Sequence, residues 1–167
     1  MRYEGRIYRP PSEANSLILQ FTLGCSHNRC SFCAMYSDKR YRVRPFAEIQ
    51  EDIAEAARYY PGTRRVFIGD GDALSAGCDA FEQVCIAINK AFPRLERIAA
   101  YVNARDILQC TAEELARLRR LRFSLAYLGL ESGSEEVLTL IRKGATPADM
   151  IARSEEHTSE LQSHHDL

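Results

Sequence analysis

The sequence predicts an α/β protein with a parallel sheet, built from about four strand–helix units and one further helix. Short apolar runs of strand length alternate along its 167 residues with longer segments whose apolar residues recur at helical spacing. Each apolar run is followed by glycine and polar residues. Helical crossovers between short buried strands produce a parallel sheet, and ligands bind where the carboxyl ends of its strands meet.

Four strands are expected in chain order. Each is a short run of apolar and β-branched residues, as in strands buried on both faces of a sheet. The runs are "SLILQFTL" (16–23), "RVFIGD" (65–70), "RIAAYVN" (97–103) and "FSLAYLGLE" (123–131). The residues that end them are Gly24-Cys25, Gly69-Asp70-Gly71-Asp72, Asn103-Ala104-Arg105 and Glu131-Ser132-Gly133. We therefore expect these four strand ends to form one functional edge.

The helices between these strands are predicted by apolar spacing and by their caps. The first spans 45–60 and ends at Pro61-Gly62, and the second spans 79–92. The later helices are predicted by Thr111 with Glu114 as a capping box, by Ser134 with Gly144, and by Thr146 with Pro147. This alternation of strands and helices suits one domain with a sizeable core.

Composition limits the class of protein. The formal net charge of −1 gives no overall attraction to nucleic acid or to a membrane. The N-terminal residues are polar and the apolar runs are only strand-length, so we expect neither a signal peptide nor a membrane span. A cytoplasmic protein is therefore predicted, with no membrane or nucleic-acid partner. Its six cysteines are expected to be reduced thiols or metal ligands, with Cys78, Cys85 and Cys110 as small buried apolar residues.

Three of the cysteines lie in the segment "GCSHNRCSFC", with the spacing Cys25-x4-Cys30-x2-Cys33. Three thiolates suit a 4Fe–4S cluster that has one iron without a protein ligand. The alternative is a zinc-stabilised binding module in which His27 supplies the fourth ligand. A thioredoxin-like pair of Cys30 and Cys33, or loop thiols without metal in a structural domain, would also fit. The spacing alone leaves these interpretations open.

The cysteine segment, the aromatic Phe32 before its last cysteine, and "GLESGS" (129–134) resemble the radical S-adenosylmethionine (radical SAM) superfamily. The resemblance covers about residues 17 to 152. Its first cysteine gap is one residue longer than the superfamily's common Cys-x3-Cys-x2-Cys spacing. The resemblance implies a partial (β/α) barrel with parallel strands, of which about four of six units are present, so that the fold is incomplete at the C-terminus.

The resemblance also implies a chemistry. Cys25, Cys30 and Cys33 would bind three irons of a 4Fe–4S cluster, and the fourth iron would take the amino and carboxylate groups of S-adenosylmethionine. Reductive cleavage of this cosubstrate yields methionine and a 5′-deoxyadenosyl radical, which abstracts hydrogen from a substrate. The implied partner is an electron donor such as flavodoxin or ferredoxin. The substrate is not predicted.

The same resemblance assigns residues to S-adenosylmethionine. Phe32 would flank the adenine. Gly71 and Asp72 would correspond to the last two residues of the superfamily's Gly-Gly-Glu, which holds the methionine amine, although Asp70 replaces the first glycine. Asn103 and Glu131 would approach the ribose hydroxyls and the methionine end.

The chain then divides into a leader (1–16), a truncated radical SAM core (17–152) and a tail (153–167). The tail "RSEEHTSELQSHHDL" lacks a helical apolar stripe and matches, letter for letter, the translation of a short-read sequencing adapter with its index. We therefore expect a natural sequence that continues differently after residue 152, and an isolated fragment that is inactive. The tail histidines, which are His157, His164 and His165, are not counted as ligands.

Overall fold

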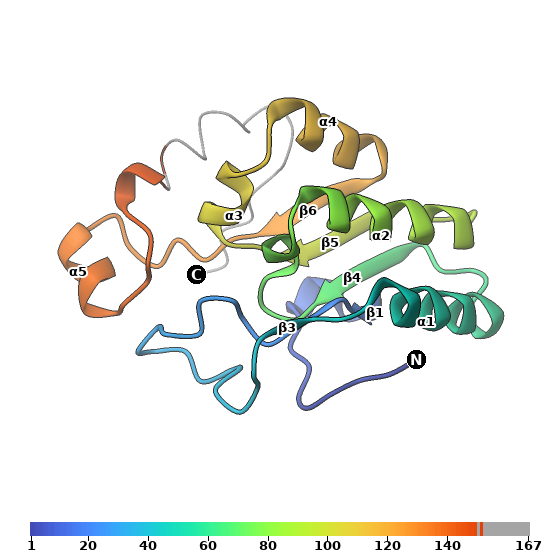
Figure 1. Cartoon of the computed structure of the whole chain (residues 1–167), viewed down its shortest axis with the longest axis horizontal. Coiled ribbons are helices and arrows are strands. Elements are labelled where there is room, and N and C mark those ends of the chain that lie inside the picture. The colour runs from blue at the N-terminus through green and yellow to red at the C-terminus, as the bar shows by residue number, and fades with distance from the viewer. Residues whose placement is uncertain (150, 152–167) are drawn as a thin grey trace.

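The computed structural model describes residues 1–149 and 151. Its centre is a four-stranded sheet in the order β1 (Leu17–Gln20), β4 (Arg65–Gly69), β5 (Arg97–Tyr101) and β6 (Phe123–Tyr127) (Figure 1). All neighbouring strands in this sheet are parallel. The predicted α/β class with a parallel sheet is therefore confirmed. The interpretation of 153–167 as an adapter tail concerns residues outside the described part of the chain.

Three long helices pack on the sheet, namely α1 (Phe46–Tyr59), α2 (Cys78–Ala91) and α4 (Ala112–Arg120) (Figure 1). Contacts run from β1 to α1, from α1 to α2, from α2 to α4, and from α4 to β6. The main core lies between the helices and the sheet. There the rings of Phe81 and Phe123 pack edge to face, with 4.9 Å between their centres. The predicted capping box of Thr111 and Glu114 is present at the start of α4. Over residues 1–149 and 151, the helices are too short or too polar to cross a membrane.

The other face of the sheet carries a second, smaller cluster that contains Phe67 and Tyr127. Side chains alternate between the two faces along each strand, so Ile68 belongs to the main core while Phe67 belongs to this cluster. The 3-10 turn η1 (Pro11–Glu13) reaches this face, because the Tyr127 hydroxyl donates a hydrogen bond to Glu13 Oε1 at 2.8 Å. The N-terminal segment is thus packed into the fold.

The strand ends meet at one edge, as predicted. Gln20 pairs with Gly69, and Tyr101 pairs with Tyr127, so that the carboxyl ends lie side by side within each pair. The spatial order of the strands is also their order along the chain, and each helical crossover joins neighbouring strands. This is the connectivity of a (β/α) barrel.

Several boundaries differ from the prediction. The first strand is interrupted at Phe21, and β2 (Thr22–Leu23) leaves the sheet to pair antiparallel with β3 (Arg42–Val43). The last strand ends at Tyr127 instead of continuing to Glu131, whose φ of 63° is incompatible with an extended strand. The remaining elements are η2 (Ala73–Ala76), α3 (Ala104–Leu108) and α5 (Glu135–Leu140). Among these, η2 and α3 were not expected from the sequence.

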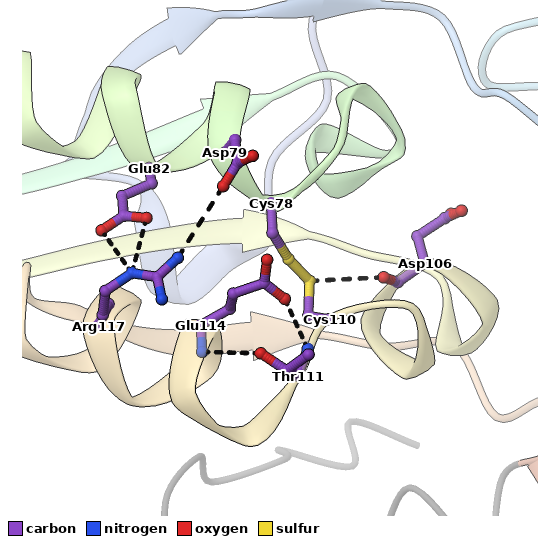
Figure 2. The surroundings of a disulfide bond; sticks show 8 residues. All are labelled: Cys78, Asp79, Glu82, Asp106, Cys110, Thr111, Glu114 and Arg117. Carbon is purple, nitrogen blue, oxygen red and sulfur yellow. Dashed lines mark hydrogen bonds and ion pairs between the residues drawn. A yellow bond between two sulfur atoms is a disulfide. The ribbon is translucent and has the colours of Figure 1, made fainter.

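The prediction that Cys78 and Cys110 are reduced thiols is wrong in this structure, where they form a disulfide (Figure 2). Their Cα atoms lie 6.0 Å apart, within the range that a disulfide requires. The bond joins the first residue of α2 to the segment between α3 and α4. A separation of 32 residues gave no sign of this proximity in the sequence. Cys85 is fully buried, as expected, and burial raises the pKa of its thiol.

Candidate functional site

The cysteine loop, residues 24–41, connects β2 to β3 and is attached to the edge of the sheet by Asp70. The Asp70 carboxylate is fully buried and accepts hydrogen bonds from the backbone N–H of Gly24 at 2.9 Å and from Gln20 Nε2 at 3.1 Å. It also forms an ion pair of 2.7 Å with Lys39 Nζ. Asp70 therefore holds the loop at both of its ends. In the sequence, Asp70 was recognised only as a departure from Gly-Gly-Glu, although a carboxylate directly after a buried strand could have indicated an anchor.

The three cysteines of this loop all have free, partly buried thiols. Burial raises the pKa of Cys30, the nearby thiols of Cys33 and Cys25 raise it further, and Lys143 lowers it. The three sulfurs are therefore close enough to interact electrostatically. Three free thiols in one loop are the donor set that an iron–sulfur cluster needs. Within residues 1–149 and 151, however, no three His, Cys, Asp or Glu side chains converge into a formed metal site.

The ring of His27, the fourth ligand in the zinc alternative, contacts the turn after α5. Its Nε2 lies 2.7 Å from the carbonyl oxygen of Arg142. A Cβ at Gly144, which has a φ of +72°, would come within 2.5 Å of the same ring. The backbone N–H of Ser31 also donates to the carbonyl of Ile141 at 2.9 Å. These contacts dock the cysteine loop on the end of α5 and give the His27 ring a partner in the protein.

Asp72 lies after β4 and is fully buried. Its Oδ2 accepts hydrogen bonds from Asn103 Nδ2 at 2.7 Å and from the Ser26 hydroxyl. Burial and the neighbouring Asp106 carboxyl raise the pKa of Asp72 to about 7, against the opposing effect of Ser26 and Asn103. The structure thus brings together two of the predicted residues, Asp72 and Asn103, and adds Ser26 and Asp106, which the sequence analysis did not find.

Gly71 lies where the segment after β4 comes close to the cysteine loop. A Cβ at this position would lie 2.5 Å from the ring of Tyr36 and 3.1 Å from the Cβ of Cys25. The Gly71 N–H also donates to the carbonyl of Gly24 at 3.1 Å. A glycine is therefore needed here for steric reasons. Its absence of a side chain places Cys25 directly beside the segment that carries Asp72.

Phe32 and Glu131, the other predicted residues, both lie close to Lys143. Lys143 Nζ forms an ion pair of 3.1 Å with Glu131 and lies 6.0 Å from the centre of the Phe32 ring. The Lys143 side chain is only 12% exposed, whereas Phe32 is 53% exposed. Glu131 and Lys143 both act electrostatically on Cys30. Lys143 was not among the residues that the sequence predicted for the site.

A narrow cleft lies between the residues around Asp72 and the residues around Lys143. It lies between the cysteine loop, the start of α3 and the turn after α5. Its lining includes His27, Asn103, Arg105, Lys143 and Gly144. Asn103, which bonds Asp72, and Lys143, which neighbours Cys30, therefore face one common cleft.

A family model described as "Radical SAM superfamily" matches residues 19–156. The chain belongs to the radical SAM superfamily. The resemblance found in the sequence, and the partial-barrel fold that it implied, are thereby confirmed. A search of curated proteins returns no match.

Solved radical SAM enzymes share the fold. Coproporphyrinogen III oxidase (HemN) from Escherichia coli matches with a TM-score of 0.62 and 16% identity, over 84% of this chain and 33% of its own. The cobalamin-dependent enzyme OxsB with aqua-cobalamin bound matches with a TM-score of 0.58 and 20% identity, over 84% of this chain and 22% of its own. The hydrogenase maturase HydG from Carboxydothermus hydrogenoformans matches with a TM-score of 0.56 and 18% identity, over 87% of this chain and 34% of its own. This radical SAM chain thus spans between 22% and 34% of the length of these proteins.

Proposed function

We propose that this chain is part of the core of a radical SAM enzyme and binds a 4Fe–4S cluster through Cys25, Cys30 and Cys33. The observation that supports this most is that one loop carries three free thiols and brings the Cβ of Cys25 against Gly71, the residue before Asp72. Membership of the superfamily implies cluster binding and S-adenosylmethionine cleavage at the family level. When bound, the cluster supplies the electron that cleaves S-adenosylmethionine to methionine and a 5′-deoxyadenosyl radical.

The remaining residues bind and orient the cosubstrate in this proposal. Asp72 pairs with the methionine ammonium. Asn103 and Ser26 hold the Asp72 carboxylate in place, because both donate to its Oδ2. Phe32, exposed beside the cysteines, covers the adenine. Glu131, held by Lys143, closes the cleft on the other side. An electron donor of the flavodoxin or ferredoxin type would reduce the cluster from outside.

The test is anaerobic reconstitution with iron and sulfide, followed by iron and sulfide analysis. We expect about four irons per chain in the wild type, as in a 4Fe–4S cluster, and a loss of most of this iron in Cys30→Ala. Two controls should keep the iron: Ser31→Ala, an exposed neighbour in the same loop, and Cys85→Ala, a thiol in the core.

Two results would overturn the assignment. One is a full iron complement in Cys30→Ala. The other is a colourless protein that holds one zinc and loses it in His27→Ala, which would establish the zinc-stabilised module instead.

A further inference from the structure

We propose that Asp106 is a positioning residue for Asp72: the two carboxyl groups share one proton in the free protein, and a cationic ligand displaces it. The identity of that ligand, the ammonium group of S-adenosylmethionine, rests on the proposed function. The shared proton does not depend on it, because it follows from the two carboxyl groups alone.

The first observation is that both carboxyl groups are buried and incompletely paired. Asp72 is fully buried and Asp106 is 6% exposed. Asp72 Oδ1 and Asp106 Oδ2 have no hydrogen-bond donor among the described residues. Leaving a buried carboxylate oxygen without a donor is costly. A proton held between the two groups removes this cost for both, since each oxygen then has a partner.

The second observation is that the two groups lie close together. Asn103 donates to Asp72 Oδ2 through its side chain and accepts from the Asp106 N–H through its backbone carbonyl. Burial raises the pKa of Asp72, and the Asp106 carboxyl is near enough to raise it further. Two carboxylates in contact cannot both be ionised without strong repulsion, and burial increases that repulsion. A hydrogen bond between them therefore requires one proton. Asp72 and Asp106 should therefore titrate as a unit, as other strongly interacting pairs of acids do.

The fold holds both groups in place. Asp72 precedes η2, and its carbonyl oxygen accepts from the Ser75 hydroxyl at 2.6 Å. Asp106 lies in α3, where its N–H donates to the carbonyl of Asn103 at 3.1 Å. The disulfide links the segments that follow η2 and α3, and Figure 2 shows Asp106 beside it, with its carbonyl oxygen 3.7 Å from Cys110 Sγ. The two carboxyl groups are thus carried by cross-linked segments.

The surrounding groups decide where the shared proton is released. From the cysteine loop, Ser26 donates to Asp72 Oδ2. Burial raises the pKa of Tyr41 in the same loop, and Tyr41 lies close enough for both acids to raise that pKa further. From α3, Arg105 Nε lies 3.4 Å from Asp106 Oδ1, but its side chain is half exposed, so water screens its charge. From the end of β5, Asn103 donates to the same oxygen as Ser26. These donors favour the ionised form only partly, which leaves a midpoint near neutral pH.

The consequence for binding has a definite sign. Below the midpoint the pair holds its proton. This proton must leave to solvent before Asp72 can pair with a cation. Affinity for the cation therefore rises as the pH rises through the midpoint. Linkage limits the gain to about tenfold per pH unit for one proton released.

The test uses the full chain without cluster or ligand. Carboxyl ¹³C NMR of the aspartates is followed from pH 4 to pH 9. In the wild type, Asp72 should titrate with a midpoint of about 7. In Asp106→Asn it should titrate roughly two units lower, because the amide donates to the ionised carboxylate. Asp79→Asn, the same change at an exposed acid, should leave the midpoint unchanged.

A second variant, Ser26→Ala, should shift the titration midpoint of Asp72 in the opposite direction. It removes a donor to the ionised Asp72, so the midpoint should rise. A wild-type midpoint near 4, or a midpoint that does not move in a folded Asp106→Asn protein, would overturn the shared proton.

Binding of S-adenosylmethionine to the reconstituted chain at pH 6 and pH 8 gives the second readout. From pH 6 to pH 8, the affinity of the wild type should rise on the order of tenfold more than that of Asp106→Asn. Any titration of the ligand itself affects both proteins equally and cancels in this comparison. Equal gains would overturn the displacement of the proton. Absence of binding in both proteins would instead refute the proposed function, while the NMR titration would still decide whether the proton is shared.

Discussion

Asp70 and Asp72 flank a single glycine but have opposite environments. Asp70 is fully paired, with Gly24, Gln20 and Lys39 on its two oxygens. Asp72 has donors on one oxygen only. This difference explains the Asp-Gly-Asp sequence where the superfamily resemblance implied Gly-Gly-Glu. The first acid anchors the cysteine loop, and the second is left for a ligand.

Replacing Asp70 should show the value of this anchor. In Asp70→Asn, the ammonium of Lys39, whose side chain is 7% exposed, loses its buried partner. We expect the free energy of unfolding in urea to fall by about 3 kcal/mol, as for other broken buried pairs. Glu96→Gln breaks the exposed pair of Glu96 with Arg64 and should cost less than about 1 kcal/mol. Equal losses in the two variants would contradict the anchoring role of Asp70.

At the scale of elements, the sequence predicted what local chemistry determines. The side-chain caps at Thr111 and Ser134 and the apolar strands are local signals, and both caps are present. The break between β1 and β2, the two-residue strand β3 and the five-residue α3 were missed, because segments this short show no measurable periodicity. Their geometry depends on long-range contacts. The disulfide was missed for the same reason.

That disulfide gives a prediction about the elements it joins. Cys78→Ala/Cys110→Ala should lower the free energy of unfolding by about 3 to 4 kcal/mol, because the loop of 32 residues regains entropy in the unfolded chain. Thermal unfolding with and without dithiothreitol checks this. The reductant should destabilise the wild type and leave the double variant unchanged. If it has no effect on the wild type either, the bond does not contribute to stability.

At the scale of the whole molecule, the site results from parallel strands that end together. This rule was enough to predict from the sequence that Asp72 and Asn103 would lie at the same edge of the sheet, and the structure places Asn103 Nδ2 at 2.7 Å from Asp72 Oδ2. It was not enough for Asp106 and Lys143, whose positions depend on how α3 and the turn after α5 pack. The predicted Phe32 and Glu131 lie with Lys143 near Cys30.

The central claim is that three cysteines leave one iron for S-adenosylmethionine. The most direct test is ⁵⁷Fe Mössbauer spectroscopy of the anaerobically reconstituted chain before and after S-adenosylmethionine is added. With three thiolate ligands from the protein, one iron of the four should change its isomer shift on addition, and the other three should not. A cluster whose four irons are all unaffected by S-adenosylmethionine would contradict the account.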